Sequence, residues 1–230
     1  FLPEIKKVLD EITLKMIQNQ FSDENINKYE EKRKIGENDS YICELIRNDS
    51  IDEFVSYLNR TNTLLSTKIE RSIFETNSYL NENDPNLIEY AAFFGSIQIF
   101  NYLRFNRVEL NSNLWIYSIH SKNSELIHLL ESIQVPPPND SFESCLIESI
   151  KCHHNDLAKY FENTKTIENC KENVVESSFK YYNYEYLPDN MVQNYIFFNL
   201  VQNKYMKVVD IWLNSKKEDI LSNIDLKDEI

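Results

Sequence analysis

A two-helix pattern that recurs along the chain restricts the fold more than any other feature of the sequence. In each copy a short apolar helix ends at a small polar turn, and a second helix then carries a broad apolar face. A single pair of this size cannot bury its own apolar surface, so neighbouring pairs must stack on one another. Four copies are clear and a fifth is looser: residues 41–58, 90–103, 117–130, 148–161 and 198–213. The pattern predicts an all-α array of helix pairs.

The second helix of each pair places apolar residues at positions i, i+1, i+3 and i+4, which share one side of a helix. In the first pair these residues are Phe54, Val55, Tyr57 and Leu58. Short polar signals mark where the second helices begin. The run from Ser50 to Glu53 is typical of a capping box, and Ser96 stands where the next pair needs an N-cap.

The scarcity of glycine and proline also favours helices. The 230 residues include two glycines and six prolines, whereas the tight turns of all-β proteins depend on both. Gly95 lies where the chain leaves one helix and reverses into the next, a position that commonly needs a positive φ. Lys122 and either His154 or its neighbour take this place in other pairs, so glycine is favourable there but not required.

Residues 1–38 are expected to form an N-terminal helical cap. Its first helix is amphipathic, with apolar residues at alternating spacings of three and four: Leu2, Ile5, Leu9, Ile12 and Met16. The stripe is too short for a sustained coiled coil, so we expect it to pack on the body of the protein. A second, very polar helix starts at Ser22 or Asp23 and ends near Gly36 and Asn38.

The remaining residues, 39–230, are expected to form the irregular repeat array. A long gap between the fourth and fifth pairs contains a further apolar stretch, which we interpret as an inserted helix and loop at about residues 165–194. The aromatic run KYYNYEY at 180–186 is expected to pack in the core of this insertion, with a protein contact as the alternative. Trp115 and Trp212 occupy core positions of the repeats.

The segment AAFFGSIQIFNYLRFNRVELN resembles the ankyrin-repeat consensus AAxxGHLEVVKLLLxxGADVN. Ala91 and Ala92 match the paired alanines, and Gly95 matches the glycine of the turn. The wider run over about residues 40–215 is similar to a divergent ankyrin family that is expanded in certain parasitic protists. That family is usually described as an ankyrin-type domain of unknown function. The resemblance implies an ankyrin-like solenoid of stacked helix pairs.

The chain departs from the ankyrin pattern in the links between pairs. Ala91 and its equivalent Ser118 are closer together than the roughly 33 residues of an ankyrin repeat. The sequence from Asn113 to Ile116 stands in place of the TPLH motif. We therefore expect the β-hairpin fingers of an ankyrin array to be shortened or missing, which leaves the first helices as the better binding face.

The resemblance also implies a set of partner-binding residues. Ankyrin-like repeats contact partners through the two residues after the alanine pair, which face a concave groove. Carried over position by position, these are Asn48, Asp49, Phe93, Phe94, His120, Ser121, Lys151 and Cys152. Phe93 and Phe94 have an alternative role, because both rings could pack between repeats or under the N-terminal helices. If either ring is exposed, it would mark a contact site.

Signals for a metal site or for catalysis are weak. Cys152, His153 and His154 follow Cys145 and are residue types that zinc prefers. The two histidines fall in an inter-helix turn, however, where adjacent side chains point apart. The sequence assigns no nucleophile or acid to His120, and motifs for phosphate, dinucleotide, zinc-protease or serine-hydrolase chemistry are absent. We therefore expect no metal, no cofactor and no enzymatic activity.

The charge and cysteine content restrict the partners. A formal net charge of −13 argues against nucleic acid and anionic membranes, which both reward clusters of Lys and Arg. The same charge is compatible with a basic protein surface. No apolar run approaches the roughly 20 residues of a membrane span. The four cysteines form no CxxC motif and no signal peptide is evident, which favours a reducing, intracellular (cytoplasmic) location.

The sequence thus predicts a non-enzymatic protein-binding scaffold or adaptor that uses the concave groove. One alternative is a structural protein that self-associates, as a homo-oligomer, through the N-terminal amphipathic helix or the insertion. Another is an uncharacterised enzyme or metal-binding protein built around His120 or the turn from Cys152 to His154.

Overall fold

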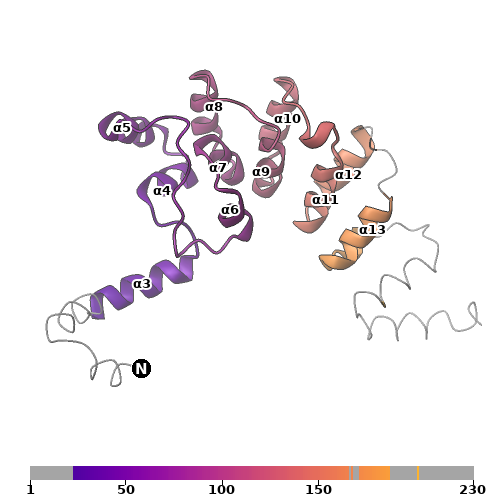
Figure 1. The fold of residues 1–230 in the computed structure, drawn as a ribbon, viewed down its shortest axis with the longest axis horizontal. Helices are drawn as coiled ribbons and strands as arrows, with labels where there is room; N and C mark the ends of the chain where they lie inside the picture. The colour runs from indigo at the N-terminus through magenta and orange to yellow at the C-terminus, as the bar shows by residue number, and fades with distance from the viewer. Residues whose placement is uncertain (1–22, 166, 168–170, 187–200, 202–230) are drawn as a thin grey trace, which may run out of the picture. The chain divides into compact units, whose positions relative to one another are not determined.

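The computed structural model describes residues 23–165, 167, 171–186 and 201, and over these residues the chain is all-helical (Figure 1). The described residues form 11 α-helices, labelled α3 to α13, and the two short 3₁₀ helices η1 and η2. The described residues form no strand, and their β-type pairing is a single antiparallel bridge between Lys68 and Asn86. The predicted all-α class is therefore confirmed.

The chain divides into two compact units, Phe1–Glu109 and Leu110–Ile230. The first unit contains α3 (Asp23–Ile35), α4 (Tyr41–Arg47), α5 (Ile51–Thr61), α6 (Ser78–Asn83), α7 (Leu87–Phe94) and α8 (Ile97–Phe105). Helix α4 packs on α5 and α7 packs on α8, while α4 also lies against α7 and α5 against α8. The first unit is thus two stacked helix pairs, in which Phe54, Phe100 and Leu103 are buried.

The second unit contains α9 (Leu114–Ser121), α10 (Ser124–Ser132), η1 (Pro138–Asp140), α11 (Glu143–Lys151), α12 (Asn155–Thr164), α13 (Lys171–Lys180) and η2 (Tyr184–Tyr186). Helix α9 pairs with α10 and α11 pairs with α12, and α11 lies between α9 and α13. Trp115 is buried in this unit, with its ring 5.0 Å from that of Phe142 and 6.3 Å from that of Phe161. Its predicted core role is confirmed, whereas Trp212 lies outside the described residues.

Of the N-terminal cap expected over residues 1–38, the structure describes α3, and the amphipathic helix expected before it lies outside the described residues. Helix α3 ends at Gly36, as predicted, where φ is 73°. A Cβ on Gly36 would lie 2.9 Å from Oγ1 of Thr76, so both the backbone and the packing require glycine. Lys32 in the last turn of α3 pairs with Asp39 at 2.8 Å, and the Asn38 side chain donates to the carbonyl of Glu70.

The turn inside each helix pair has the same backbone geometry in both units. Two residues before the next helix, φ is positive at Asp49 (50°), Gly95 (72°), Lys122 (54°), His153 (57°) and Tyr182 (58°). At four of these turns the next backbone N–H bonds the carbonyl five residues earlier, as from Ser96 to Ala91 at 2.9 Å, whereas after Lys122 the Asn123 N–H bonds the Ser121 hydroxyl at 3.1 Å. The left-handed turn predicted from Gly95 is therefore present, and four other residue types adopt it.

After some of these turns the first residue connects neighbouring pairs. Ser96 is the N-cap residue of α8, as predicted, but its hydroxyl donates to the carbonyl of Ile46 in α4 instead of capping its own helix. His154, in the same position before α12, donates from Nδ1 to the carbonyl of Ile119 in α9 at 2.9 Å. The same inter-pair hydrogen bond thus occurs in both units, made by two different residue types.

The predicted capping box at Ser50 is wrong, because the Ser50 side chain makes no capping hydrogen bond. A capping box is present one pair later. There the side chain of Asn86 accepts from the Glu89 backbone at 3.0 Å, and Glu89 accepts from the backbone of Asn86 at 2.9 Å. The sequence shows the same capping-box pattern at both places, with a glutamate three residues after Asn86 and three residues after Ser50.

Helix α13 lies in the segment expected to be an insertion, yet it has the local geometry of a first helix. The Ser178 hydroxyl donates to the carbonyl of Val174, as Ser149 does to Cys145 in α11. Asn183 follows the positive-φ residue and donates to the carbonyl of Ile150 at 2.8 Å. This bond repeats the inter-pair link made by His154, so α13 extends the pattern of the preceding pairs. The looser pair expected at 198–213 lies outside the described residues, apart from residue 201.

The links that follow α8 and α10 contain no strand, as the sequence predicted. After α8 and after α10 the chain forms turns and, at Pro138, the 3₁₀ helix η1. In these two described links no hairpin finger is present. Any partner contact at these pairs therefore has to come from the helices and their turns.

Candidate functional site

The eight residues predicted to bind a partner fall into two groups of four, one in each unit. Phe93 is buried, with 9% of its surface exposed, and so has the packing role that the sequence left open as the alternative. Phe94 is half-buried. Its ring centroid lies 4.8 Å from that of Tyr90, and the guanidinium of Arg47 lies 5.9 Å from it.

Asp49 is engaged inside the first unit. Its two carboxylate oxygens accept hydrogen bonds from the backbone of Ile99 at 2.9 Å and of Gln98 at 3.0 Å. The carboxylate thus caps α8 of the neighbouring pair, where the helix dipole favours a negative charge. Asn48 is exposed at the end of α4, so of these two residues it alone remains open to a partner.

Arg47 holds the end of α4 in a polar cluster that sequence reasoning missed. Its guanidinium donates to the carbonyl of Asn38 at 2.8 Å and to the hydroxyl of Tyr90 at 3.0 Å, and pairs with Glu37 at 2.8 Å. Burial raises the pKa of Tyr90, which therefore remains a neutral phenol. The cluster orients Phe94 and is chiefly structural, because its polar groups satisfy one another.

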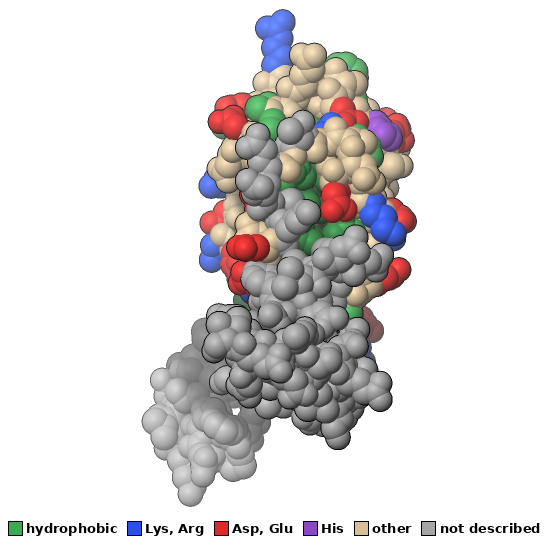
Figure 2. All heavy atoms as spheres, turned by 90° about the vertical axis from the view of Figure 1, so that its right-hand side faces the viewer, with side chains coloured by type: hydrophobic (Ala, Val, Ile, Leu, Met, Phe, Trp, Pro, Cys, Tyr) green, Lys and Arg blue, Asp and Glu red, His purple; other side chains and the backbone are tan. Residues whose placement is uncertain are grey.

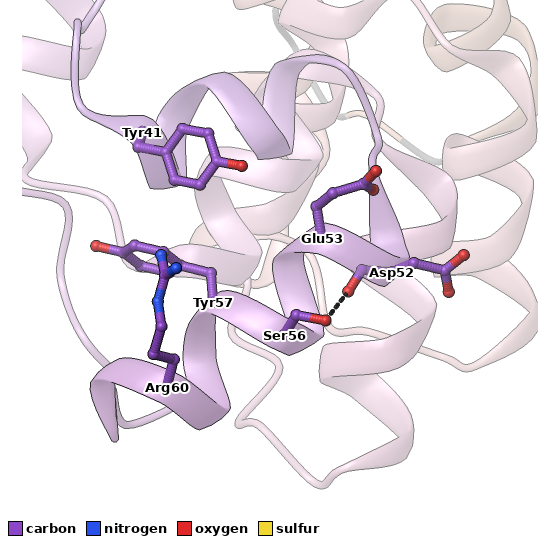
Figure 3. Close-up of a pocket in the computed structure, with 6 residues that line it drawn as sticks. All are labelled: Tyr41, Asp52, Glu53, Ser56, Tyr57 and Arg60. Atoms are coloured by element: carbon purple, nitrogen blue, oxygen red, sulfur yellow. Dashed lines mark hydrogen bonds between the residues drawn. The ribbon is translucent and has the colours of Figure 1, made fainter.

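A hollow of about 370 Å³ lies on the surface of α5 and at the start of α4 (Figure 3). It is lined by Tyr41, Asp52, Glu53, Ser56, Tyr57 and Arg60. The rings of Tyr41 and Tyr57 meet edge to face at 5.5 Å, and 48% of the Tyr41 surface is exposed. Both acidic residues are exposed, while the Ser56 hydroxyl donates to the carbonyl of Asp52 at 2.8 Å.

The hollow was not foreseen, because the periodicity placed Tyr57 among the core residues of the second helix. Phe54 and Leu58 are buried as expected, but Tyr57 is only half-buried and Val55 is likewise half-buried. Arg60 lies over the Tyr57 ring, with its guanidinium 5.9 Å from the centroid. A signal was available in the sequence, since two adjacent acids on α5 precede a tyrosine and an arginine on neighbouring turns.

In the second unit the structure brings three of the predicted residues together. His120 lies in the last turn of α9, and Lys151 and Cys152 lie at the end of α11. Nε2 of His120 is 3.0 Å from Oε1 of Glu148, and its Nδ1 is 3.6 Å from Sγ of Cys152. Lys151 pairs with the same carboxylate oxygen at 2.9 Å. Ser121 donates locally to the carbonyl of Ser118 and stays outside this cluster.

The expectation that no acid or nucleophile accompanies His120 is wrong, because Glu148 and Cys152 both flank its ring. Sequence reasoning missed Glu148. In contrast, Cys152, His153 and His154, which the sequence marked as the nearest thing to a metal cluster, do not point toward one another. His153 donates to the carbonyl of Tyr181 at 2.9 Å and His154 to that of Ile119, so both histidines point away from Cys152.

The electrostatics of the cluster favour a charged carboxylate and a protonated thiol. Burial opposes ionisation of Glu148, but hydrogen bonds from His120 and Lys151 outweigh it and lower the pKa of the carboxyl. Burial, with the Glu148 charge beside it, raises the pKa of Cys152 to about 11. A thiol at the C-terminal end of a helix also lacks the positive potential that activates cysteine nucleophiles. The order Cys–His–Glu thus resembles a nucleophile with its base but lacks an activated thiolate.

The aromatic run at 180–186 divides between core and surface. Asn183 and Tyr186 are buried, while Tyr182 and Tyr184 are 63% and 41% exposed. The Lys151 ammonium lies 5.8 Å from the centroid of the Tyr181 ring. The core packing expected of the run is therefore seen at Asn183 and Tyr186, while the protein contact expected as its alternative stays a prediction.

Charged side chains are mixed on the face that Figure 2 displays. Asp and Glu side chains lie next to Lys and Arg side chains there, and neither sign gathers into a single patch. Over the described part of the chain, no helix combines the length and the apolar character needed to cross a membrane.

Comparison with known proteins gave no match to a family model, to a curated protein or to a solved structure.

Proposed function

We propose that this protein is a non-enzymatic protein-binding scaffold, and that it recognises a basic side chain of its partner. The observation that carries the proposal is the hollow on α5, whose lining includes two exposed carboxylates and two tyrosine rings (Figure 3). Tyrosine and arginine are the residue types that most often dominate binding energy at protein interfaces. We infer that Tyr41, Asp52, Glu53 and Tyr57 form the partner contact.

The chemistry of the hollow suits a Lys or Arg side chain. The face of a tyrosine attracts a cation with about 0.5–1 kcal/mol at an exposed site. Arg60 already places its own guanidinium 5.9 Å from the Tyr57 ring, which is the same interaction made within the chain. Asp52 and Glu53 add carboxylates that accept hydrogen bonds from a cationic head group. The negative net charge would speed the approach of a basic partner.

We also propose that the helix pairs form an ankyrin-like array, as the resemblance of the segment from Ala91 suggests. Support comes from the repeated left-handed turn and from the inter-pair hydrogen bonds of Ser96 and His154. The binding surface would then differ from the groove of that family. In the first unit Phe93 and Asp49 are engaged internally, which leaves α5 as the better contact.

An intracellular role fits the described cysteines, because Cys43, Cys145 and Cys152 are unpaired thiols. Self-association through the N-terminal amphipathic helix or the insertion remains an alternative. Light scattering of the full chain and of a chain without residues 1–38 tests the route through the helix. A change from oligomer to monomer on truncation would favour self-association over the scaffold proposed here.

The binding proposal can be tested with peptides by fluorescence anisotropy on the full chain. The probes are two peptides of equal length, one with several Arg and Lys residues and one with Gln in their places. We expect the basic peptide to bind more tightly and to lose affinity as salt is raised. Equal binding of both peptides would overturn the proposal.

Variants then locate the contact. Glu53→Gln combined with Asp52→Asn is expected to weaken binding of the basic peptide several-fold, since each removes a charge from the hollow. Tyr41→Ala should weaken it by a similar factor, because it removes one ring. Glu125→Gln makes the same charge change as Glu53→Gln alone, on the exposed face of α10, and serves as the control for that single variant. If Glu125→Gln weakens binding as much as the α5 variants do, the contact is not the hollow.

A further inference from the structure

The cluster at the ends of α9 and α11 brings three kinds of metal ligand to one point of the second unit. Glu148 and Cys152 are four residues apart on α11 and so share one face of that helix. His120 reaches them from α9, which packs against α11. One ligand atom from each of the three side chains lies within 4.8 Å of the other two.

The distances suit a single small cation. In a tetrahedral zinc site with bonds of about 2.0–2.3 Å, the ligand atoms are roughly 3.4–3.6 Å apart. Here Sγ of Cys152 is 3.6 Å from Nδ1 of His120 and 4.0 Å from Oε1 of Glu148. The 3.0 Å contact of Glu148 Oε1 is with Nε2, the other nitrogen of the same ring. One ring nitrogen, Sγ and one carboxylate oxygen lie within 4.8 Å of one another, so rotation of the His120 ring and shifts on the order of an ångström would bring them to tetrahedral separations.

The backbone also favours a positive charge at this point. His120 lies in the last turn of α9, and Cys152 follows the last residue of α11. Each helix end carries a partial negative charge on its free carbonyls, which stabilises a cation nearby. Lys151 now supplies that cation, with its ammonium 2.9 Å from Oε1 of Glu148.

We propose that His120, Glu148 and Cys152 bind a Zn²⁺ ion. A thiolate, an imidazole and a carboxylate together are a donor set typical of zinc, whereas magnesium and calcium prefer oxygen ligands alone. Three protein ligands leave the fourth tetrahedral position for water or for a donor from another molecule. The site is separate from the hollow on α5, so it stands or falls independently of the proposed partner contact.

Metal binding would change the roles of the surrounding groups. Cys152 would give up its proton to the solvent on binding, as thiols do when they ligate zinc. Lys151 would have to release the carboxylate oxygen of Glu148, because the ion and the ammonium compete for it. The two ring nitrogens of His120 now face different partners, so one of them would turn to the metal and the other to solvent or to Glu148.

The test is a titration of the full chain with Zn²⁺ and, in parallel, with Co²⁺ as a spectroscopic probe. Isothermal calorimetry is expected to give one Zn²⁺ ion per chain. The Co²⁺ form should show a thiolate-to-cobalt charge-transfer band in the ultraviolet together with tetrahedral bands in the visible. A titration without binding, or a Co²⁺ spectrum without the charge-transfer band, would overturn the proposal.

Variants assign the ligands. Cys152→Ser should abolish the charge-transfer band, and His120→Ala or Glu148→Gln should each weaken Zn²⁺ binding by more than about tenfold. His153→Gln and His128→Gln are matched controls, because both are exposed histidines of the same unit and neither belongs to the cluster. Loss of binding in these controls with retention in Cys152→Ser would show that Zn²⁺ binds elsewhere.

A last variant separates ligation from a merely structural role. Lys151→Met removes the ammonium that competes for Glu148, so Zn²⁺ affinity should rise by a factor of several. A fold that only needed these side chains for packing would give no such gain. Circular dichroism of each metal-free variant checks that it is folded, and if Cys152→Ser unfolds, Glu148→Gln and Lys151→Met still decide the matter. Unchanged or lower Zn²⁺ affinity in Lys151→Met would contradict the proposal that the ion and the Lys151 ammonium compete for the Glu148 carboxylate.

Discussion

The carboxylate of Asp49 accepts a hydrogen bond from the backbone nitrogen of Ile99 at 2.9 Å, which joins the turn of one helix pair to the start of the second helix in the next. The residue was predicted to face a partner. Its side chain instead satisfies two of the N–H groups that the first turn of a helix leaves unpaired. Asp49 thus links two helix pairs within the first unit, and replacing it should lower the free energy of unfolding.

Asp49→Ala is therefore expected to lower the free energy of unfolding by about 1–2 kcal/mol, the usual cost of losing a helix cap. Urea denaturation followed by circular dichroism measures it. Asn48→Ala is the control, because that neighbouring side chain is exposed and should change stability by less than about 0.5 kcal/mol. Equal effects of the two substitutions would contradict the capping role.

Much of the helical architecture follows from the sequence because its causes are local. Spacings of three and four place Phe54 and Leu58 on one face, and the turn before α8 demands the positive φ that Gly95 supplies. The cluster around His120 could not be predicted in the same way. His120 and Cys152 are 32 residues apart, and their meeting depends on how α9 and α11 pack.

Helix α13, in the segment interpreted as an insertion, has a local geometry that its residue types do not reveal. The consensus expects small residues and glycine near the turn, whereas α13 ends in Lys180 and a run of tyrosines. What marks it as a first helix is the Asn183 hydrogen bond to the carbonyl of Ile150. Ser96, His154 and Asn183 make equivalent bonds with chemically different side chains, so the amino-acid type alone does not reveal the pattern.

Ser96→Ala should destabilise the first unit by about 0.5–1.5 kcal/mol, the usual net worth of one hydrogen bond. The substitution removes the hydroxyl bond to the carbonyl of Ile46, which still accepts from the Asp49 backbone at 2.9 Å. Ser50→Ala is the matched control, since Ser50 holds the same N-cap position and makes no capping bond. Chemical denaturation of both variants measures the difference, and a loss in Ser50→Ala as large as in Ser96→Ala would argue against the inter-pair bond.

Lys122→Gly is expected to stabilise the second unit by up to about 1 kcal/mol. Lys122 adopts a φ of 54° at the end of α9, a conformation that costs a residue with a Cβ roughly 1–2 kcal/mol. Part of this gain is lost to the greater flexibility of glycine in the unfolded chain. Gly95→Ala, at the equivalent turn with φ of 72°, should destabilise by a comparable amount.

Thermal unfolding followed by circular dichroism tests the pair of turn variants. Lys159→Gly is the comparison that isolates the backbone effect, because Lys159 is exposed in the interior of α12. There the same exchange of lysine for glycine should destabilise by about 1 kcal/mol. If Lys122→Gly lowers the unfolding temperature as Lys159→Gly does, the backbone strain at Lys122 is smaller than the entropic cost of introducing glycine.

The link between α3 and the following chain should weaken in acid. A hydrogen bond from Lys32, assisted by one from Ser72, lowers the pKa of Asp39 below its ordinary value of 3.8. Because the folded pKa lies below the unfolded one, the ion pair contributes stability above pH 3.8 and loses it as the pH falls through the folded pKa. Both side chains are partly exposed, so the contribution at neutral pH should be under about 1 kcal/mol.

An NMR titration of the Asp39 carboxyl carbon measures this directly. In the unchanged protein its midpoint should fall below 3.8, and in Lys32→Gln it should move back toward that value. Asp39→Asn should lower stability at pH 7 and make no difference below the folded pKa of Asp39, where the carboxyl of the unchanged protein is neutral too. Lys28→Gln removes a cation one turn earlier on α3 and should leave the Asp39 midpoint in place. A midpoint that Lys32→Gln leaves unmoved would show that the ammonium is not what holds the carboxylate ionised.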